Sequence, residues 1–269
     1  MKVRKTIEIL SQLAFKSVLS KPSEGLMALT LLCLLEWPDG VQRQSYVKIF
    51  SKQQGVGIFN EILGYLLSKA ENLPVASKAG VLILPDELVK QIKTDVAPVA
   101  FVTTRINGSS PSSFYNVGDM INFKVLYNIL NDWNKLHEAI AFDEWVANQD
   151  RNLGNLIIDS NNAVTLIDHS NMPVDLVWSS AMLDEELEPR NVLAEVFRSS
   201  PTLPQKVEIL KGAANQSSSL EFIREELSFW ARELLNQSES DSLFQFLENR
   251  AKKSNERLSK RFGTLAGVA

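Results

Sequence analysis

The first hundred residues alternate short apolar runs with turn residues, a pattern typical of a β-rich region. Strands are expected at residues 26–36, 43–50, 80–84 and 99–104. Between the second and third of these, apolar residues at helical spacing predict a helix over 59–70, which Pro74 limits. Its apolar stripe consists of Phe59, Ile62, Leu63, Leu66 and Leu67. Apolar positions within residues 1–19 predict a short helix that leads into a strand.

Beyond a Ser-rich loop at 107–113, the hydrophobic period is mainly that of helices. Helices are predicted at 121–139, 142–147 and, as several segments, within 186–262. The clearest is 220–235, where Ile223, Leu227, Trp230 and Leu234 lie on one face. We therefore predict an α+β protein with a two-lobed, protein-kinase-like fold. Its small, β-rich N-terminal lobe would span 1–104, and its larger helical C-terminal lobe would span 105–269.

One hairpin interrupts the helical region and gathers polar side chains. Two β-branched-rich runs, 156–159 and 163–167, flank a turn at 160–162. Asn155 precedes the outgoing strand and Asp168 follows the returning one, so both are expected at the same end of the hairpin. Asp150 lies five residues before Asn155, within reach of that end.

Asp150, Asn155 and Asp168 have the spacing of the kinase catalytic loop and its metal-binding aspartate. Transfer of the ATP γ-phosphoryl group needs a residue that accepts or orients the proton of the substrate hydroxyl, and oxygen ligands for Mg²⁺. We expect Asp150 to fill the first role, and Asn155 and Asp168 to bind the metal. The alternative is that these residues only favour the turns around a hairpin.

A kinase also needs a lysine that holds the nucleotide phosphates, and Lys48 in the predicted strand 43–50 fits this role. Glu61, thirteen residues later, stands at the edge of the apolar stripe of the helix, where it can pair with Lys48. A solvated carboxylate is the simpler alternative for Glu61. Thr103 and Arg105 fall at the predicted lobe junction, where exposed backbone groups would bind the adenine edge of ATP.

A glycine-rich phosphate loop of the form G-x-G-x-x-G is missing from the sequence. Residues 17–25, which include Ser20, Lys21, Ser23 and Gly25, are the candidate substitute, since hydroxyls and backbone N–H groups can surround phosphates. An ordinary polar connection between strands explains this segment equally well.

Composition narrows the class of function. The net charge is −4, with both signs mixed along the chain, which argues against nucleic-acid binding as the main task. The only cysteine, Cys33, lies in an apolar run and has no disulfide partner, and two histidines with one cysteine are too few for a structural zinc site. Neither a secretory signal nor an apolar run of eighteen residues is evident, so we expect a cytoplasmic protein that does not bind membranes.

Together these residues resemble the HipA-like kinase family, bacterial Ser/Thr kinases with a phosphatidylinositol-kinase-like core. The resemblance extends from about residue 20 to 260, through Lys48, Glu61 and the segment 246–250, but only 148–170 is highly specific. Asn152 departs from the histidine frequent at its position in the family. Asp168-His169-Ser170 replaces Asp-Phe-Gly, which argues against an activation loop of the eukaryotic type.

The resemblance implies an ATP- and Mg²⁺-dependent kinase that phosphorylates a protein Ser or Thr. It further implies the toxin component of a toxin–antitoxin system, with an antitoxin partner and a translation-related protein as substrate. A small-molecule phosphotransferase of the aminoglycoside-kinase type is a second hypothesis, in which the acidic run 184–188 would face a cationic ligand. A third is a non-catalytic module that binds a nucleotide or a partner.

Overall fold

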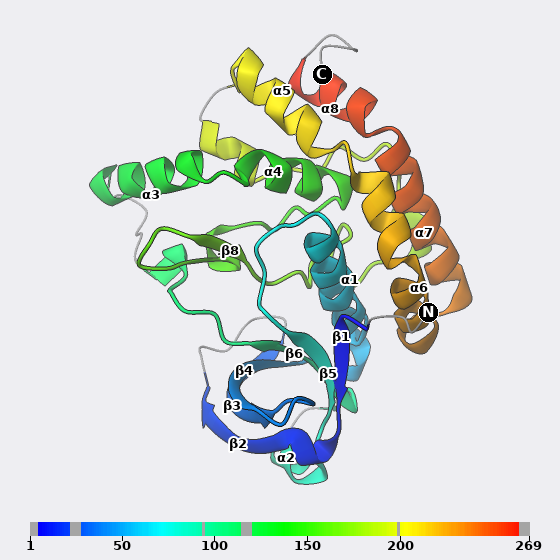
Figure 1. Cartoon of the computed structure of the whole chain (residues 1–269). Helices are drawn as coiled ribbons and strands as arrows, with labels where there is room; N and C mark the ends of the chain where they lie inside the picture. Colours follow the sequence, from blue (N-terminus) through cyan, green and yellow to red (C-terminus); the bar gives the residue numbers. More distant parts are fainter. Residues whose placement is uncertain (1–4, 22–27, 93–94, 114–119, 198–199, 264–269) are drawn as a thin grey trace.

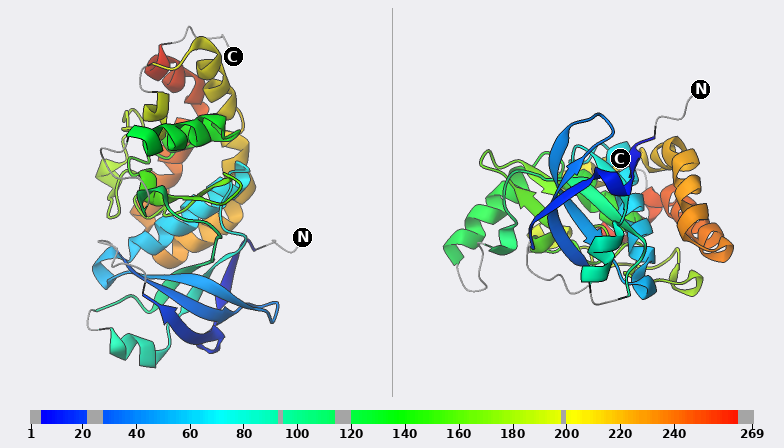
Figure 2. Two further views of the ribbon diagram at one scale, coloured as in Figure 1. Left: turned by 90° about the vertical axis from the view of Figure 1, so that its left-hand side faces the viewer. Right: turned by 90° about the horizontal axis from the view of Figure 1, so that it is seen from below.

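The chain forms a mixed α+β structure, with a six-stranded sheet on its N-terminal side and a helical C-terminal part (Figure 1). The computed structural model describes residues 5–21, 28–92, 95–113, 120–197 and 200–263. In the side view, the sheet lies at one end of an elongated molecule and most of the helices lie toward the other (Figure 2). None of the helices within the described ranges is long and apolar enough to cross a membrane.

The sheet has the strand order β1-β5-β6-β4-β3-β2, in which only the β1–β5 pair is parallel. Its strands are β1 (Ile7–Leu10), β2 (Phe15–Ser20), β3 (Leu29–Glu36), β4 (Gln42–Ile49), β5 (Ala79–Ile83) and β6 (Val99–Thr104). The four predicted strands are confirmed. A turn joins β3 to β4, and in it the Gly40 N–H donates to the carbonyl of Trp37 at 2.8 Å.

The prediction for residues 1–19 was wrong in part, because the described residues of this segment, 5–19, contribute to two strands and form no α-helix. Only a short 3-10 turn, Gln12–Ala14, separates β1 from β2, and these strands occupy the two opposite edges of the sheet. Pairing of β1 with β5 and of β2 with β3 fixes both segments as strands, which apolar spacing alone could not reveal. The short link also draws the two edges toward each other, so the sheet curls.

The curled sheet has an apolar core of its own, to which the short helix α2 (Asp86–Gln91) adds Leu88. Cys33 is part of this core, as expected for a small apolar side chain, and burial raises the pKa of its thiol to about 12. Other members come from β3, β4, β5 and β6: Leu31, Leu35, Val47, Ile49, Leu82, Ala100 and Val102.

Helix α1 (Val56–Ala70) connects the sheet to the helical part. It contacts β6 on one side and α6 (Gln216–Leu234) on the other. Residues 57–68 are therefore all buried, and the prediction of a one-sided apolar stripe was wrong. A helix packed on both sides needs apolar residues around most of its circumference. Glu61 lies inside the molecule for the same reason.

The remaining helices differ from the prediction at two places. The expected helix 121–139 is divided into α3 (Met120–Asp132) and α4 (Leu136–Trp145), and α4 also covers most of the expected helix 142–147. The break follows Trp133, which is buried and whose carbonyl accepts from the Leu136 N–H at 3.0 Å. Within 186–202, the described residues 186–197 and 200–202 hold only a 3-10 turn, Leu193–Phe197. The helices α5 (Leu203–Gly212), α7 (Gln237–Lys252) and α8 (Ser254–Phe262) complete this part with α6.

The predicted hairpin is confirmed as β7 (Leu156–Ile158) and β8 (Val164–Leu166), which lie between the sheet and the helices (Figure 1). Its turn contains Asn162 in the left-handed conformation, with φ of 62°. The Leu166 N–H donates to the carbonyl of Pro74 at 2.8 Å, so the hairpin is fixed to the segment that follows α1.

Candidate active site

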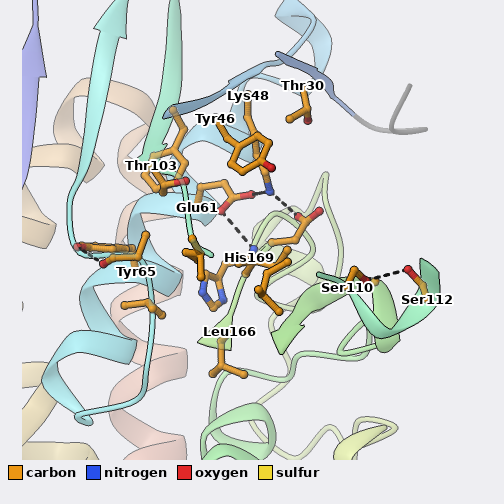
Figure 3. Close-up of a pocket in the computed structure, with 18 residues that line it drawn as sticks. Thr30, Tyr46, Lys48, Glu61, Tyr65, Thr103, Ser110, Ser112, Leu166 and His169 are labelled. Carbon is orange, nitrogen blue, oxygen red and sulfur yellow. Dashed lines mark hydrogen bonds and ion pairs between the residues drawn. The ribbon is translucent and has the colours of Figure 1, made fainter. Parts of the chain in front are cut away.

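Lys48 lies at the centre of a cluster of charged side chains from three separate segments. Its Nζ is 2.5 Å from Oε1 of Glu61 on α1 and 3.0 Å from Oδ1 of Asp168, which follows β8 (Figure 3). In β4 the neighbouring residues Val47 and Ile49 point into the core of the sheet, so Lys48 points from the opposite face. The predicted pair of Lys48 and Glu61 is thus present, and Glu61 is not a solvated carboxylate.

The two carboxylates beside Lys48 differ in their environment. Glu61 is 2% exposed, and burial raises its pKa to about 7 although the nearby Lys48 opposes this change. Asp168 is 39% exposed; burial alone would raise its pKa, but the charge of Lys48 and a hydrogen bond from that lysine hold it well below the usual range. Burial would also lower the pKa of Lys48, but the charges of Asp168 and Glu61 outweigh burial and raise it. Lys48 and Asp168 therefore stay charged.

Asp168 has an unusual backbone conformation, with φ of 57°. Left-handed backbone is uncommon in residues other than glycine and often occurs at functional sites. Two neighbouring contacts maintain it here. Ser170 Oγ donates to Asp168 Oδ1 at 2.8 Å, and the His169 N–H donates to Glu61 Oε2 at 3.2 Å. The backbone next to Asp168 is thereby bound to the residue that positions Lys48.

Asp150 accepts hydrogen bonds from side-chain amides on both carboxylate oxygens. Asn152 Nδ2 donates to Oδ1 at 2.8 Å, and Asn171 Nδ2 and Asn155 Nδ2 donate to Oδ2 at 2.5 and 3.3 Å. Asn155 Nδ2 also donates to the backbone carbonyl of Asp150. Since the amide nitrogen of Asn155 is directed at Asp150, its Oδ1 oxygen is left for a cation.

The hairpin brings Asn155 and Asp168 to the same end, as predicted. Leu156 pairs with Leu166, and the Ile167 N–H donates to the Asn155 carbonyl at 3.1 Å. One carboxylate and one amide oxygen suit Mg²⁺, which usually takes one or two protein oxygen ligands together with phosphates and water. No group of three or more His, Cys, Asp or Glu residues with metal-binding geometry occurs in the described ranges.

Arg151 supports the loop that carries Asp150 and Asn155. Its guanidinium is fully buried, donates to Asp143 Oδ1 on α4 at 3.0 Å, and donates to the carbonyl of Ile167 at 3.1 Å. It thus links the loop to the helical part and to the residue before Asp168. Removal of one partner from a buried ion pair leaves an uncompensated charge, so Arg151 and Asp143 depend on each other.

A cavity of about 440 Å³ adjoins the charged cluster and has a size suited to a nucleotide-sized ligand. Lys48, Glu61 and Asp168 line one region, and apolar residues line much of the remainder. These residues come from α1, the segment after it, β6 and the segment after it, β7 and β8: Tyr65, Val75, Ala76, Phe101, Ile106, Ile157 and Leu166. Thr30, Tyr46, Thr103, Ser110 and Ser112 add hydroxyl groups at its edges (Figure 3).

Two predicted nucleotide contacts have different outcomes. Thr103 lines the cavity, as expected, whereas Arg105 does not and instead donates from Nη1 to Gln44 Oε1 at 2.5 Å. The backbone N–H groups expected to be exposed at this junction are engaged as well, since Thr104 N–H donates to Lys78 O and Arg105 N–H to Gln44 O. Of the candidate phosphate segment, Ser17 and Ser20 lie on β2, and residues 22–27 are outside the described ranges.

The acidic run 184–188 contacts basic residues of the last two helices, and none of its residues lines the cavity. Glu185 and Glu186 lie 2.9 and 2.8 Å from Lys253 Nζ, and Glu188 lies 2.8 Å from Lys260 Nζ. The buried Arg250 donates to the carbonyls of Glu185 and Leu187, both at 2.9 Å. The run therefore stabilises the helical part and is not a cation-binding wall of the site.

The sequence did not reveal several residues that complete the site. Tyr46 could have been found, because it lies two positions before Lys48 and so shares its face of the strand. Asn60 gave no such signal, because its amide contacts Ser170 and Leu176, which are more than a hundred positions away. Asn171 gave none either, because its partner Asp150 lies on the other side of the hairpin in the sequence. Compared with models of known protein families and with curated proteins, the sequence has no match.

Proposed function

We propose that this protein is an ATP- and Mg²⁺-dependent kinase with a two-lobed, kinase-like fold that phosphorylates a protein Ser or Thr. The observation that carries the proposal is the meeting of Lys48, Glu61 and Asp168 at one cavity, with Nζ to carboxylate distances of 2.5 and 3.0 Å. A lysine held by a buried helix glutamate beside a metal-binding aspartate is the arrangement that protein kinases use for phosphoryl transfer.

Each residue then has a defined task. Lys48 binds the phosphates, and Glu61 fixes its ammonium group from the buried side. Asn155 Oδ1 and the half-buried carboxylate of Asp168 would hold Mg²⁺, which would neutralise charge on the transferred phosphoryl group. Asp150 orients the hydroxyl of the substrate and receives its proton. The apolar walls of the cavity, among them Leu166 and Ile157, hold the base of the nucleotide.

A protein acceptor is favoured over a small cationic one. The small-molecule hypothesis relied on the run 184–188, and its glutamates are neutralised by Lys253 and Lys260 away from the cavity. The resemblance to HipA-like kinases supports the same choice, and with it a toxin role, an antitoxin partner and a translation-related substrate. A purely nucleotide-binding module would have no need for Asp150 to be held by three amides.

Labelling of a bacterial lysate with radioactive ATP tests the proposal. Wild-type protein should label protein bands, and Asp150→Asn should lower the rate by roughly 10²- to 10⁴-fold while it keeps ATP affinity. Lys48→Ala should weaken both binding and transfer, because it contacts phosphates in every state. Asn161→Ala, an exposed turn residue at the other end of the hairpin, is the matched control and should behave as wild type.

Two results would contradict the proposal. Loss of ATP binding in a folded Asp150→Asn variant would make Asp150 a nucleotide ligand. Label that appears only in aminoglycosides or other small amines would assign the enzyme to the small-molecule class.

A further inference from the structure

Four consecutive residues after β8 each contact a different part of the proposed machinery. Asp168 binds Lys48, and the His169 N–H donates to Glu61. The Ser170 carbonyl accepts a hydrogen bond from Asn60 Nδ2 at 2.6 Å. Asn171 Nδ2 donates to Asp150 Oδ2 at 2.5 Å. The segment 168–171 therefore links the phosphate-binding lysine to the residue that handles the substrate hydroxyl.

The amide of Asn171 has its donor directed at the Asp150 carboxylate. Its Oδ1 atom is buried and has no hydrogen-bond partner among the described residues. The reverse orientation would place an amide oxygen against a carboxylate oxygen, which is repulsive. A buried acceptor without a partner is unfavourable. The bond from Nδ2 to Asp150 is therefore the interaction that keeps the Asn171 side chain in this orientation.

The backbone that carries Asn171 is itself fixed by α1. Asn60 is completely buried, and its Nδ2 donates to the carbonyls of Ser170 and Leu176 at 2.6 and 3.0 Å. Its Oδ1 accepts from Trp178 Nε1 at 2.9 Å. Both N–H donors and the oxygen of the Asn60 amide thus bind residues on either side of Asn171 in the sequence. The position of Asn171 is set by the helix that also provides Glu61.

We propose that Asn171 is a positioning residue for phosphoryl transfer, which acts by fixing the orientation of the Asp150 carboxylate. The assignment rests on the proposed kinase function. Of the three residues whose amides contact the Asp150 carboxylate, Asn152 is exposed. Asn155 has the longest contact, 3.3 Å, and is also the proposed metal ligand. Asn171 has the shortest contact with the carboxylate, and the backbone before it is held by the buried amide of Asn60, so it determines which carboxylate oxygen is presented to the substrate.

Steady-state kinetics of Asn171→Ala test this role. We expect kcat to fall about 10- to 100-fold, as for the loss of a hydrogen bond to a charged group, with KM for ATP changed less than about twofold. Asn171→Asp has nearly the same shape but replaces the donor with a second carboxylate. It should be at least as impaired as the alanine variant. Asn161→Ala serves as the asparagine control, with wild-type kcat.

A double-mutant cycle with Asp150→Asn separates positioning from a merely structural role. If Asn171 acts through Asp150, Asn171→Ala should cause little further loss of kcat in the Asp150→Asn background. Multiplicative losses, or wild-type kcat for Asn171→Ala or Asn171→Asp, would overturn the assignment while the kinase function stands. A wild-type protein that transfers no phosphate to any lysate protein would overturn the proposed function and this assignment with it.

Discussion

At the scale of single residues, the exposure of two carboxylates determines what each can do. Glu61 is 2% exposed and Asp168 is 39% exposed, although both bind the same ammonium group of Lys48. A buried charge that loses its partner is costly, so Glu61 remains paired. Asp168 faces the cavity and can exchange part of its interaction with Lys48 for a cation. One carboxylate thus holds the lysine, and the other is accessible to a cation.

The burial of His169 makes the stability of the fold depend on pH. Its ring is buried, and burial together with the positive charges of Arg151 and Lys48 lowers its pKa well below the ordinary value. It is therefore neutral when folded, whereas in the unfolded chain it takes up a proton near pH 6.5. This group contributes no pH dependence above about 6.5, and it destabilises the fold as the pH falls below that value.

We predict that His169→Gln reduces the loss of stability on acidification. Between pH 6.5 and 5, wild type should lose up to about 2 kcal/mol more of its unfolding free energy than the variant, since one proton is worth about 1.4 kcal/mol per pH unit. Urea unfolding at several pH values measures this difference. His137 is only partly buried and stacks on Phe197, so His137→Gln is the control with the smaller effect. Parallel pH curves for wild type and His169→Gln would contradict the explanation.

At the scale of elements, one face of α1 is shaped to fit the segment that follows β8. Gly57, Asn60, Glu61 and Gly64 share this face by their helical spacing. A side chain at Gly57 would meet the ring of Phe50 at 2.5 Å and Leu176 Cδ1 at 2.9 Å, and one at Gly64 would overlap with Cβ of His169. The two glycines allow close approach, and the two polar residues between them make the hydrogen bonds. Close contact is required at this face for Glu61 to reach both Lys48 and His169.

Gly64→Ala should therefore destabilise the protein by about 1–3 kcal/mol, the usual cost of overpacking, and should weaken ATP binding because α1 is displaced. Gly55→Ala is the matched control. Its new methyl group would meet only the Lys52 carbonyl, at 3.3 Å, and its backbone is right-handed helical. We expect the control to stay within about 1 kcal/mol of wild type. Equal stabilities of the Gly64→Ala and wild-type proteins in denaturant titration would contradict the requirement for close contact between α1 and His169.

The elements that the sequence predicted well are those whose pattern is local. The β7–β8 hairpin follows from two apolar runs around Ser160–Asn162, and Lys48 follows from an alternating strand. The strands at residues 7–20 and the break between α3 and α4 depend on pairing and packing with distant segments. Apolar spacing was also insufficient for α1, since burial on both sides removes the polar face that marks an amphipathic helix.

At the scale of the whole molecule, the site lies where α1 and the β7–β8 hairpin meet the sheet. Three of its residues, Asp150, Asn155 and Asp168, lie within one short segment, which is why their spacing was informative. The contacts of Asn60 with Ser170 and of Glu61 with His169 join residues more than a hundred positions apart. The pattern of a single sequence does not indicate which distant residues pair, so Asn60 could not be predicted and was found only in the structure.

Calorimetric titration with ATP tests most directly whether this cluster binds ATP through Mg²⁺. Wild-type protein should bind ATP in the presence of Mg²⁺ and at least about tenfold more weakly in EDTA, because the phosphate charge then faces the carboxylate of Asp168 without compensation. Asp168→Asn, which keeps the shape of the side chain, should lose most of this metal dependence, and Asn161→Ala should retain it. Equal affinity of the wild-type protein for ATP with Mg²⁺ and with EDTA would contradict the account.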